Sequence, residues 1–430
     1  MTRFGTMWRR GFVLAASLAL LASVAPAATF AQDEAGGEVV VMTYFSKDLG
    51  ETALKDLLAQ FEADSGVTVQ FADVGHEDFK TGILIQLAGG NPPDVHSNWA
   101  GARTAFQVQN GALAPLDEMW AANDLDSQFP QGLIDSAATY DGAKYLLPLG
   151  YHYAGMFYNP KTFESAGVAV PTTWDELKAS CDAFNAAGIV PISLGSMNKW
   201  PAQFWFDYLL LRTAGPEYRA KLMAGEAAYT DPEVVRAMEL WAELANAKCF
   251  TPDANAFDWT DAADQVANGE AAMNLMGTWI TGYWNGNGLV PATDYDFFEF
   301  PVIDEGVATA VVGPVDGLVS AAGAANPEAA MALIASLATP EAQTAWAVGQ
   351  GALPPNVNAD KAQFNEVILK ALDVVAASET YNFNYDLATP PAPSEVGLDM
   401  FQKFVADPAQ DVNALLAETQ TAIEAAFANQ

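Results

Sequence analysis

The residues that could carry chemistry in this chain are carboxylates and aromatic rings rather than histidines or thiols. The sequence holds 53 Asp and Glu, 11 Trp and 13 Tyr, but only three His and two Cys. The histidines lie far apart, and no HExxH pair, G-x-S-x-G elbow or Gly-Lys-Ser/Thr phosphate loop occurs. The acidic residues 253–264 have Asp258 where a calcium loop needs Gly. We therefore predict no catalytic residue, no metal and no cofactor.

Many of the Trp residues stand beside Gly, Pro, Asn or Asp rather than in apolar helical stripes. The C–H faces of a sugar lie flat on indole and phenol rings, while its hydroxyls need fixed Asp, Asn, Gln or Tyr partners. A chain rich in both aromatic rings and such polar side chains is suited to binding carbohydrate. A secreted carbohydrate-active enzyme would also use Trp and paired carboxylates, and with so many acids such pairs are inevitable, so this alternative stays open.

The formal net charge of −34 at pH 7 restricts the partners. Such a field repels polyanions, because phosphate affinity depends on Lys and Arg. We therefore expect no nucleic acid, anionic lipid or phosphorylated ligand, which leaves a neutral or a cationic small molecule. In a receptor for a cation such as a polyamine, Asp316 and Asp386 would act as counter-charges, and affinity would fall steeply with ionic strength.

The first residues read as an export signal. Arg3, Arg9 and Arg10 precede the apolar run Phe12–Val24, and small residues lead to a cleavage site at Ala31–Gln32. A single-span anchor is the competing interpretation, but the apolar run is shorter than the roughly 20 residues that a bilayer requires. We expect residues 1–31 to be removed and the protein to act in the periplasm or at the extracellular face of the membrane.

Cys181 and Cys249 are the only cysteines. In an exported protein an even pair reads first as a disulfide, here between two helices of one lobe, and two buried free thiols are the alternative.

The elements that must position these residues begin with alternating strands and helices. Strand patterns at 38–45, 67–74 and 94–97 enclose helical patterns at 51–64 and 77–88. That βαβαβ order predicts a mostly parallel sheet covered by helices. Residues 174–268 are helix-rich, and Thr173 with Glu176 forms a capping box for the first of these helices. The length of the chain predicts two lobes.

Four tracts carry a resemblance to a known family. They are TYDGAKYLLPLGYHYAGMFYNPKTFESAGVAVPTTWDEL at 139–177, AGGNPPDVHSNWAG at 88–101, NGEAAMNLMGTWI at 268–280 and NPEAAMALIASLATPEAQTAW at 326–346. In this order they resemble the family 1 extracellular solute-binding proteins, the sugar-capturing receptors of ABC importers, similar in fold to maltose-binding protein. The resemblance implies an α/β, two-lobed periplasmic-binding-protein fold (type II) with a ligand cleft between discontinuous lobes. It also implies a carbohydrate ligand and transmembrane permease subunits as partners, and we expect a monomer.

The resemblance places the crossings between lobes at Leu147–Gly150, at Gly313–Gly317 and at Gly351–Pro355. We therefore expect residues 32–148 and 314–355 in the N-terminal lobe, and 149–313 and 356–430 in the C-terminal lobe. Asp141-Gly142 predicts a tight turn, and Pro148 marks a place where the chain leaves one sheet for another.

The predicted ligand contacts follow these crossings and strand ends. Open α/β sheets place ligands at the carboxyl ends of strands, where Asn98 and Trp99 are expected. The resemblance places Tyr44, at the end of the first strand, in the family's first ligand-loop position. Tyr151, His152 and Tyr153 alternate just past the first crossing, so at least one should face the cleft. Trp200 lies in a loop too polar for a core. The resemblance adds Trp279 and, through a looser match, Tyr385 with Asp386. Asp316 departs from the family's glycine- or aromatic-rich element at the second crossing, but a carboxylate there could accept two sugar hydroxyls. Core packing for the aromatic residues, and a turn role for Asp316, are the alternatives.

Overall fold

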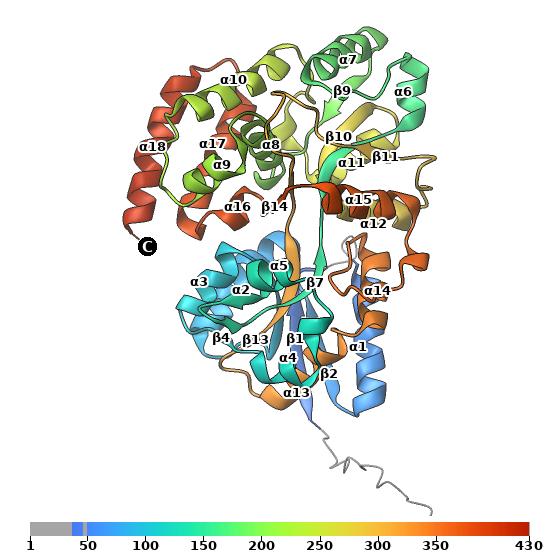
Figure 1. Ribbon diagram of the computed structural model, residues 1–430, viewed down its shortest axis with the longest axis vertical. Coiled ribbons are helices and arrows are strands. Elements are labelled where there is room, and N and C mark those ends of the chain that lie inside the picture. Colours follow the sequence, from blue (N-terminus) through green and yellow to red (C-terminus); the bar gives the residue numbers. More distant parts are fainter. Residues whose placement is uncertain (1–36, 46–49, 430) are drawn as a thin grey trace, which may run out of the picture. The chain divides into compact units, whose positions relative to one another are not determined.

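A computed structural model describes residues 37–45 and 50–429 of the chain. The proposed leader and its cleavage site at Ala31–Gln32 lie outside the described residues. Two lobes, each built on its own sheet, are joined by strands that run between them (Figure 1). Among the described helices, none is both long and apolar enough to cross a bilayer.

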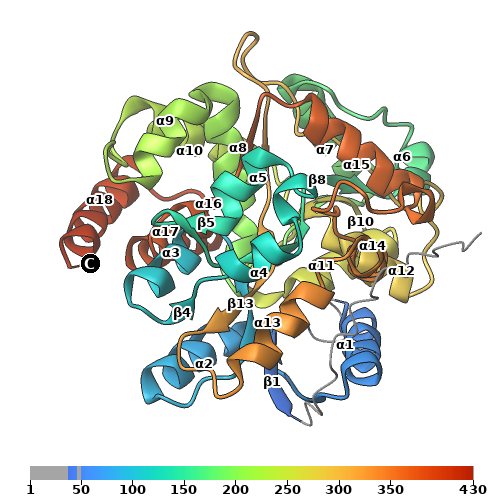
Figure 2. The same cartoon turned by 60° about the horizontal axis from the view of Figure 1, so that its bottom comes forward.

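The first lobe has a six-stranded sheet. Its strands are β1 Glu38–Thr43, β2 Thr68–Asp73, β3 Val95–Trp99, β4 Leu113–Ala114, β7 Leu147–Tyr151 and β13 Val315–Ala321. β1 pairs in parallel with β2 and β3, which confirms the predicted βαβαβ unit, whereas β13 pairs antiparallel with β3, β4 and β7. Helices α1 and α2 lie on either side of β1 (Figure 2). The helices of this lobe are α1 Glu51–Ser65, α2 His76–Gly89, α3 Ala102–Gln109, α4 Asp117–Ala122, α5 Gln131–Leu133, α13 Pro327–Ser336 and α14 Pro340–Gln350.

The second lobe has a four-stranded sheet and most of the helices. Its strands follow the order β11 Asp296–Phe298, β8 Ala154–Tyr158, β10 Ala271–Gly277, β9 Val190–Ser193. The helices are α6 Pro160–Ala166, α7 Trp174–Ala187, α8 Gln203–Thr213, α9 Gly215–Met223, α10 Pro232–Asn246, α11 Trp259–Ala267, α12 Trp279–Gly286, α15 Glu366–Ala377, α16 Tyr385–Ala388, α17 Pro391–Ala406 and α18 Val412–Ala428. The predicted capping box is present, because Glu176 N donates to Thr173 Oγ1 and the Glu176 carboxylate accepts from Thr173 N. A disulfide joins Cys181 of α7 to Cys249, which confirms the predicted bridge.

The segments that link the lobes are tied to one another. Tyr151 and Leu353 exchange two backbone hydrogen bonds of 3.0 and 2.8 Å, and His152 N donates to Pro314 O at 3.0 Å. Tyr381, in β14 Thr380–Asn382, shares its one hydroxyl proton between the carbonyls of His152, at 2.8 Å, and Pro314, at 2.9 Å. β14 pairs in parallel with β12 Ala310–Val312, directly before the second crossing. The lobes therefore meet at a hydrogen-bonded bundle of three crossing segments.

Two local predictions about the first crossing have different outcomes. Asp141 and Gly142 both have positive φ and form the two-residue turn between β5 Thr139–Tyr140 and β6 Ala143–Lys144, as predicted. The chain does leave the first sheet for the second near Pro148, but only after Tyr151, between β7 and β8 Ala154–Tyr158. Pro148 itself lies inside β7, and β13 is the one named strand among the described residues that pairs with β7, so this edge strand tolerates the missing N–H of Pro148. The lobe boundary at 148/149 stays a proposal, and it falls inside this strand.

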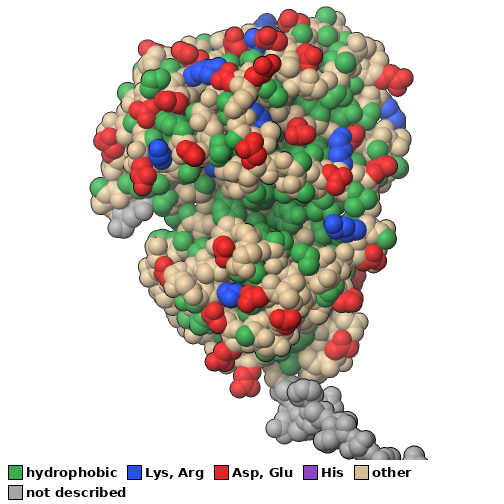
Figure 3. All heavy atoms as spheres, viewed as in Figure 1, with side chains coloured by type: hydrophobic (Ala, Val, Ile, Leu, Met, Phe, Trp, Pro, Cys, Tyr) green, Lys and Arg blue, Asp and Glu red, His purple; other side chains and the backbone are tan. Residues whose placement is uncertain are grey.

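The surface is rich in acidic side chains, as the composition implies. Acidic side chains are scattered over both lobes with fewer basic ones among them, and apolar side chains form a band where the lobes meet (Figure 3).

His96 makes the stability of this fold sensitive to acid. It lies fully buried in β3, its Nδ1 is 2.9 Å from Ser97 O, and burial lowers its pKa to about 4. Because the unfolded chain takes up this proton near pH 6.5, stability present at neutral pH is lost as pH falls through that value toward 4. We expect the wild type to lose about 2 kcal/mol more than His96→Asn between pH 7 and pH 5.

Urea unfolding of both proteins at pH 7, 6 and 5 measures this difference in the free energy of unfolding. Asn is chosen as the replacement because its amide keeps a donor for Ser97 O. Parallel stability curves for the two proteins would contradict the prediction.

Candidate ligand pocket

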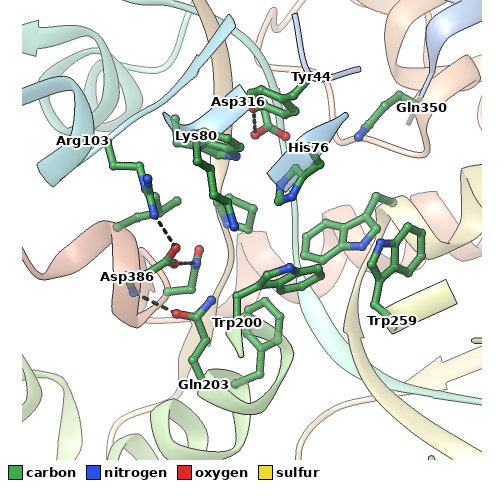
Figure 4. A pocket seen from close by; sticks show the side chains of 16 residues that line it. Tyr44, His76, Lys80, Arg103, Trp200, Gln203, Trp259, Asp316, Gln350 and Asp386 are labelled. Atoms are coloured by element: carbon green, nitrogen blue, oxygen red, sulfur yellow. Dashed lines mark hydrogen bonds and ion pairs between the residues drawn. The ribbon is translucent and has the colours of Figure 1, made fainter. Parts of the chain in front are cut away.

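A pocket of about 70 Å³ lies between the two lobes, and both contribute to its walls (Figure 4). Its aromatic lining consists of Tyr44, His76, Trp99, Trp200, Phe204, Trp259 and Trp279. Its polar and charged lining consists of Lys80, Arg103, Gln203, Asp316, Gln350, Asn384 and Asp386, with Pro314 and Leu387 completing the walls.

The aromatic wall is continuous across the lobes. Tyr44, directly after β1, stacks on Trp99 at the end of β3 with ring centroids 4.0 Å apart and planes 10° from parallel. His76 meets Trp99 edge-on at 5.4 Å and Trp200 of the second lobe at 6.0 Å. Trp200 in turn meets Trp279, the first residue of α12, at 5.9 Å. These rings offer apolar faces and edges to a flat ligand.

Asp316 anchors the polar side of the pocket. It lies in β13 and is 5% exposed, and its Oδ1 accepts from the Tyr44 hydroxyl at 2.6 Å. Burial and the Asp316 charge raise the pKa of Tyr44, which therefore stays protonated as a donor. On the other side, His152 Nε2 is 3.1 Å from Asp316 Oδ2, and His152 Nδ1 is 2.8 Å from Thr278 Oγ1. A carboxylate has room for more donors than these, so Asp316 can accept from a ligand as well.

The cations of the pocket are paired with carboxylates, and one ion pair and one hydrogen bond cross the cleft. Arg103 Nη2 of α3 donates to Asp386 Oδ2 of α16 at 3.2 Å. Trp200 Nε1 donates to Glu77 Oε1 at 3.2 Å. Burial raises the pKa of Glu77, but hydrogen bonds from His76 and the charge of Lys80 outweigh it and lower the value to about 2. Since each cation faces a carboxylate, the pocket carries no unpaired fixed cation among the described residues.

The segment from Phe383 to Leu387 approaches the first lobe closely. A Cβ on Gly101, whose φ is +92°, would lie 2.4 Å from Leu387 O, so only Gly allows this contact. Asp386 N donates to Gln203 Oε1 at 2.9 Å, which fixes the segment to the start of α8.

Six of the predicted ligand residues line the pocket: Tyr44, Trp99, Trp200, Trp279, Asp316 and Asp386. The other five do not. Asn98 turns into the lobe and donates to Thr104 and Gln107, while His152 lies behind Asp316 and Trp279. Tyr151 packs on Tyr381, Tyr153 on Phe297, and the Tyr385 hydroxyl bonds that of Tyr229. None of Tyr151, His152 and Tyr153 lines this pocket, and the expectation that at least one of them faces the cleft stays a prediction.

The pocket also contains residues that sequence reasoning missed. His76 and Lys80 stand one turn apart at the start of α2, directly after the carboxyl end of β2, and that position was a usable signal. Trp259 opens α11 behind the capping residue Asp258. Asn384 belongs to the same polar loop as the predicted Tyr385 and Asp386, whereas Gln350 carried no sequence signal, because single amides are common on any surface.

Known proteins resemble most of the chain. Residues 46–344 match the family model of the bacterial extracellular solute-binding proteins. An uncharacterised ABC transporter extracellular-binding protein of Pyrococcus horikoshii is 30% identical over 309 residues, 71% of this chain and 68% of that protein. A probable sugar-binding periplasmic protein of Mesorhizobium japonicum is 26% identical over 399 residues, 90% of this chain and 94% of that protein.

Among solved structures, the bacterial solute receptor AcbH, which has an exclusive preference for β-D-galactopyranose, superposes with a TM-score of 0.84 at 26% identity. The match covers 92% of this chain and 99% of that receptor, and confirms the predicted two-lobed α/β fold. The family match over most of the chain and this fold lead to one conclusion: the chain is a member of the bacterial extracellular solute-binding proteins.

Proposed function

We propose that the protein is the extracytoplasmic receptor of an ABC importer, and that it captures a neutral sugar and delivers it to a membrane permease. The observation that carries this proposal is the wall of stacked aromatic rings beside buried carboxylates and amides. Such a wall matches the apolar faces and hydroxyl edges of a sugar. Relatives named for sugar binding, and the galactopyranose preference of AcbH, support the same ligand class.

Capture follows from closure of the lobes around the ligand. The ligand must favour the closed form through its own contacts, and the pocket offers such contacts from both lobes. With a volume of about 70 Å³, the pocket in this form suits a single sugar ring better than a long oligosaccharide. The closed receptor then presents both lobes to the permease subunits.

The charge pairing favours a neutral ligand over a cationic one. Arg103 and Lys80 reach the pocket and neutralise Asp386 and Glu77, so a polyamine would meet cations as well as carboxylates. We further propose that the protein acts as a monomer without enzymatic activity, binds no nucleic acid, and is exported with cleavage near Ala31. Prolonged incubation with a glycan separates receptor from enzyme, because a receptor releases the glycan unchanged.

A screen of neutral sugars tests the ligand class. Trp99, Trp200 and Trp279 line the pocket, so a bound sugar should change tryptophan fluorescence. At 100 times its dissociation constant it should also stabilise the fold by about 2.7 kcal/mol and raise the melting temperature. Response to polyamines or amino acids, with silence across the sugars, would overturn the sugar assignment.

A further inference from the structure

Two amide side chains in the pocket hold oxygens with no hydrogen-bond partner in the described part of the chain. They are Asn384 Oδ1 and Gln350 Oε1. Both residues are well buried, with exposed fractions of 5% and 3%. Buried acceptors are nearly always paired, since an unpaired one loses its hydration without compensation. Each oxygen therefore needs a donor that the described protein does not supply.

The orientation of the Asn384 amide follows from its neighbour. Its Nδ2 donates to Asp386 Oδ1 at 2.6 Å, so the reversed amide would set two oxygens against each other. Asp386 is itself held by Arg103 and by its backbone bond to Gln203. Asn384 Oδ1 is thus fixed as an acceptor and cannot turn away from the pocket.

Gln350 is the last residue of α14 and comes from the other lobe. Its backbone packs tightly against α12, because a Cβ on Gly282 of that helix would lie 2.5 Å from Gln350 O. Its side-chain amide points toward the pocket and makes no hydrogen bond with a described residue (Figure 4). Gln343, two turns earlier on α14, also has an unpaired Oε1 but lies outside the pocket. A missing partner alone is therefore not enough, and position in the pocket distinguishes Gln350.

We propose that Asn384 and Gln350 are specificity-determining residues whose side-chain amides each hydrogen-bond to a different hydroxyl of the ligand, with Asn384 as the acceptor. This inference rests on the proposed sugar-binding function and deepens it. Because the two amides belong to different lobes, a sugar that bonds to both links the lobes directly. A ligand that lacks either hydroxyl leaves a buried amide unpaired and is rejected, which is a stronger filter than loss of apolar contact.

The test measures binding of D-galactose, D-glucose and D-xylose by calorimetry. Asn384→Ala and Gln350→Met should each bind the sugar that the wild type binds 10- to 100-fold more weakly. Gln343→Met is the matched control on the same helix, and Asn382→Ala is the control in the neighbouring strand, where the amide donates to Val311 O. Both controls should keep wild-type affinity even where they lower the melting temperature.

Monodeoxy derivatives of the bound sugar supply a readout that a structural defect would not give. The wild type should discriminate against removal of two particular hydroxyls, and each variant should lose discrimination at one of them. Wild-type affinity in both variants, or discrimination that both retain unchanged, overturns the inference and leaves the sugar receptor intact. A wild type that binds none of the three sugars overturns the inference together with the proposed monosaccharide ligand.

Discussion

Asp316→Ala should lower the affinity for the sugar at least 100-fold, a loss of about 3 kcal/mol in binding free energy. Hydrogen bonds to a charged group contribute about 1.5–3 kcal/mol each, and the buried carboxylate has sites left for ligand hydroxyls. The change also removes the acceptor of the Tyr44 hydroxyl, which holds the ring that stacks on Trp99. Titration calorimetry or tryptophan fluorescence measures the dissociation constant.

Asp94→Ala is the matched control for that change. Asp94 is also a buried carboxylate of the first lobe, and it accepts from Val40 N at 2.9 Å and Asn326 N at 2.8 Å. Since it lies outside the pocket lining, its loss should lower stability and leave the dissociation constant unchanged. If Asp316→Ala bound the sugar within threefold of the wild type, the carboxylate would be a structural partner of Tyr44 and no ligand contact.

The secondary structure could be predicted from the sequence because its signals lie within a few residues of one another. The capping box at Thr173 predicts a helix over 174–187, and α7 occupies those residues. The alternation of strand and helix patterns predicts the parallel β1–β2–β3 unit. The disulfide between Cys181 and Cys249 follows from the expected export of the protein and from its two cysteines, and the sequence alone supplies both.

The pocket was less readable because its contacts are distant in sequence. Tyr44 meets Asp316 across 272 positions, and Arg103 meets Asp386 across 283. Tyr153 and Trp279 are both aromatic residues two positions after the end of a strand, yet one packs inside its lobe and the other lines the pocket. The difference depends on how the chain turns after β7, which residue type does not specify.

The second large effect concerns a buried ion pair that holds the backbone of Phe383 and Tyr385, on either side of the pocket residue Asn384. Arg219 donates to Asp207 Oδ1 through Nε at 2.9 Å and Nη2 at 2.7 Å, and through Nη2 to Phe383 O at 2.7 Å. Asp207 Oδ2 accepts from Tyr385 N at 2.9 Å. The pair therefore holds the backbone on both sides of Asn384. It positions Asn384 in the pocket without lining the pocket itself.

Arg219→Met should lower the free energy of unfolding by about 3–5 kcal/mol, because it strands the fully buried Asp207 carboxylate without its partner. Even beside Arg219, burial raises the pKa of Asp207 to about 6. Without the guanidinium this pKa rises further. An acid whose pKa is raised on folding costs stability as the pH rises from its unfolded-state pKa, 3.8 for Asp, up to its folded-state pKa. Since the folded-state pKa is higher in the variant, its deficit in stability should be smaller at pH 5 than at pH 8. Urea unfolding at both pH values measures it.

Two further variants separate the buried pair from a general loss of charge. Asp207→Asn combined with Arg219→Met keeps an acceptor for Tyr385 N without a stranded charge, and should recover part of the stability. Arg236→Met breaks a bidentate pair with Asp304 in the same lobe, but that pair is exposed and should contribute under about 1 kcal/mol. Equal losses in Arg219→Met and Arg236→Met, with no dependence on pH, would contradict the assignment. Because the pair holds the backbone on both sides of Asn384, Arg219→Met should also weaken sugar binding at temperatures where it remains folded.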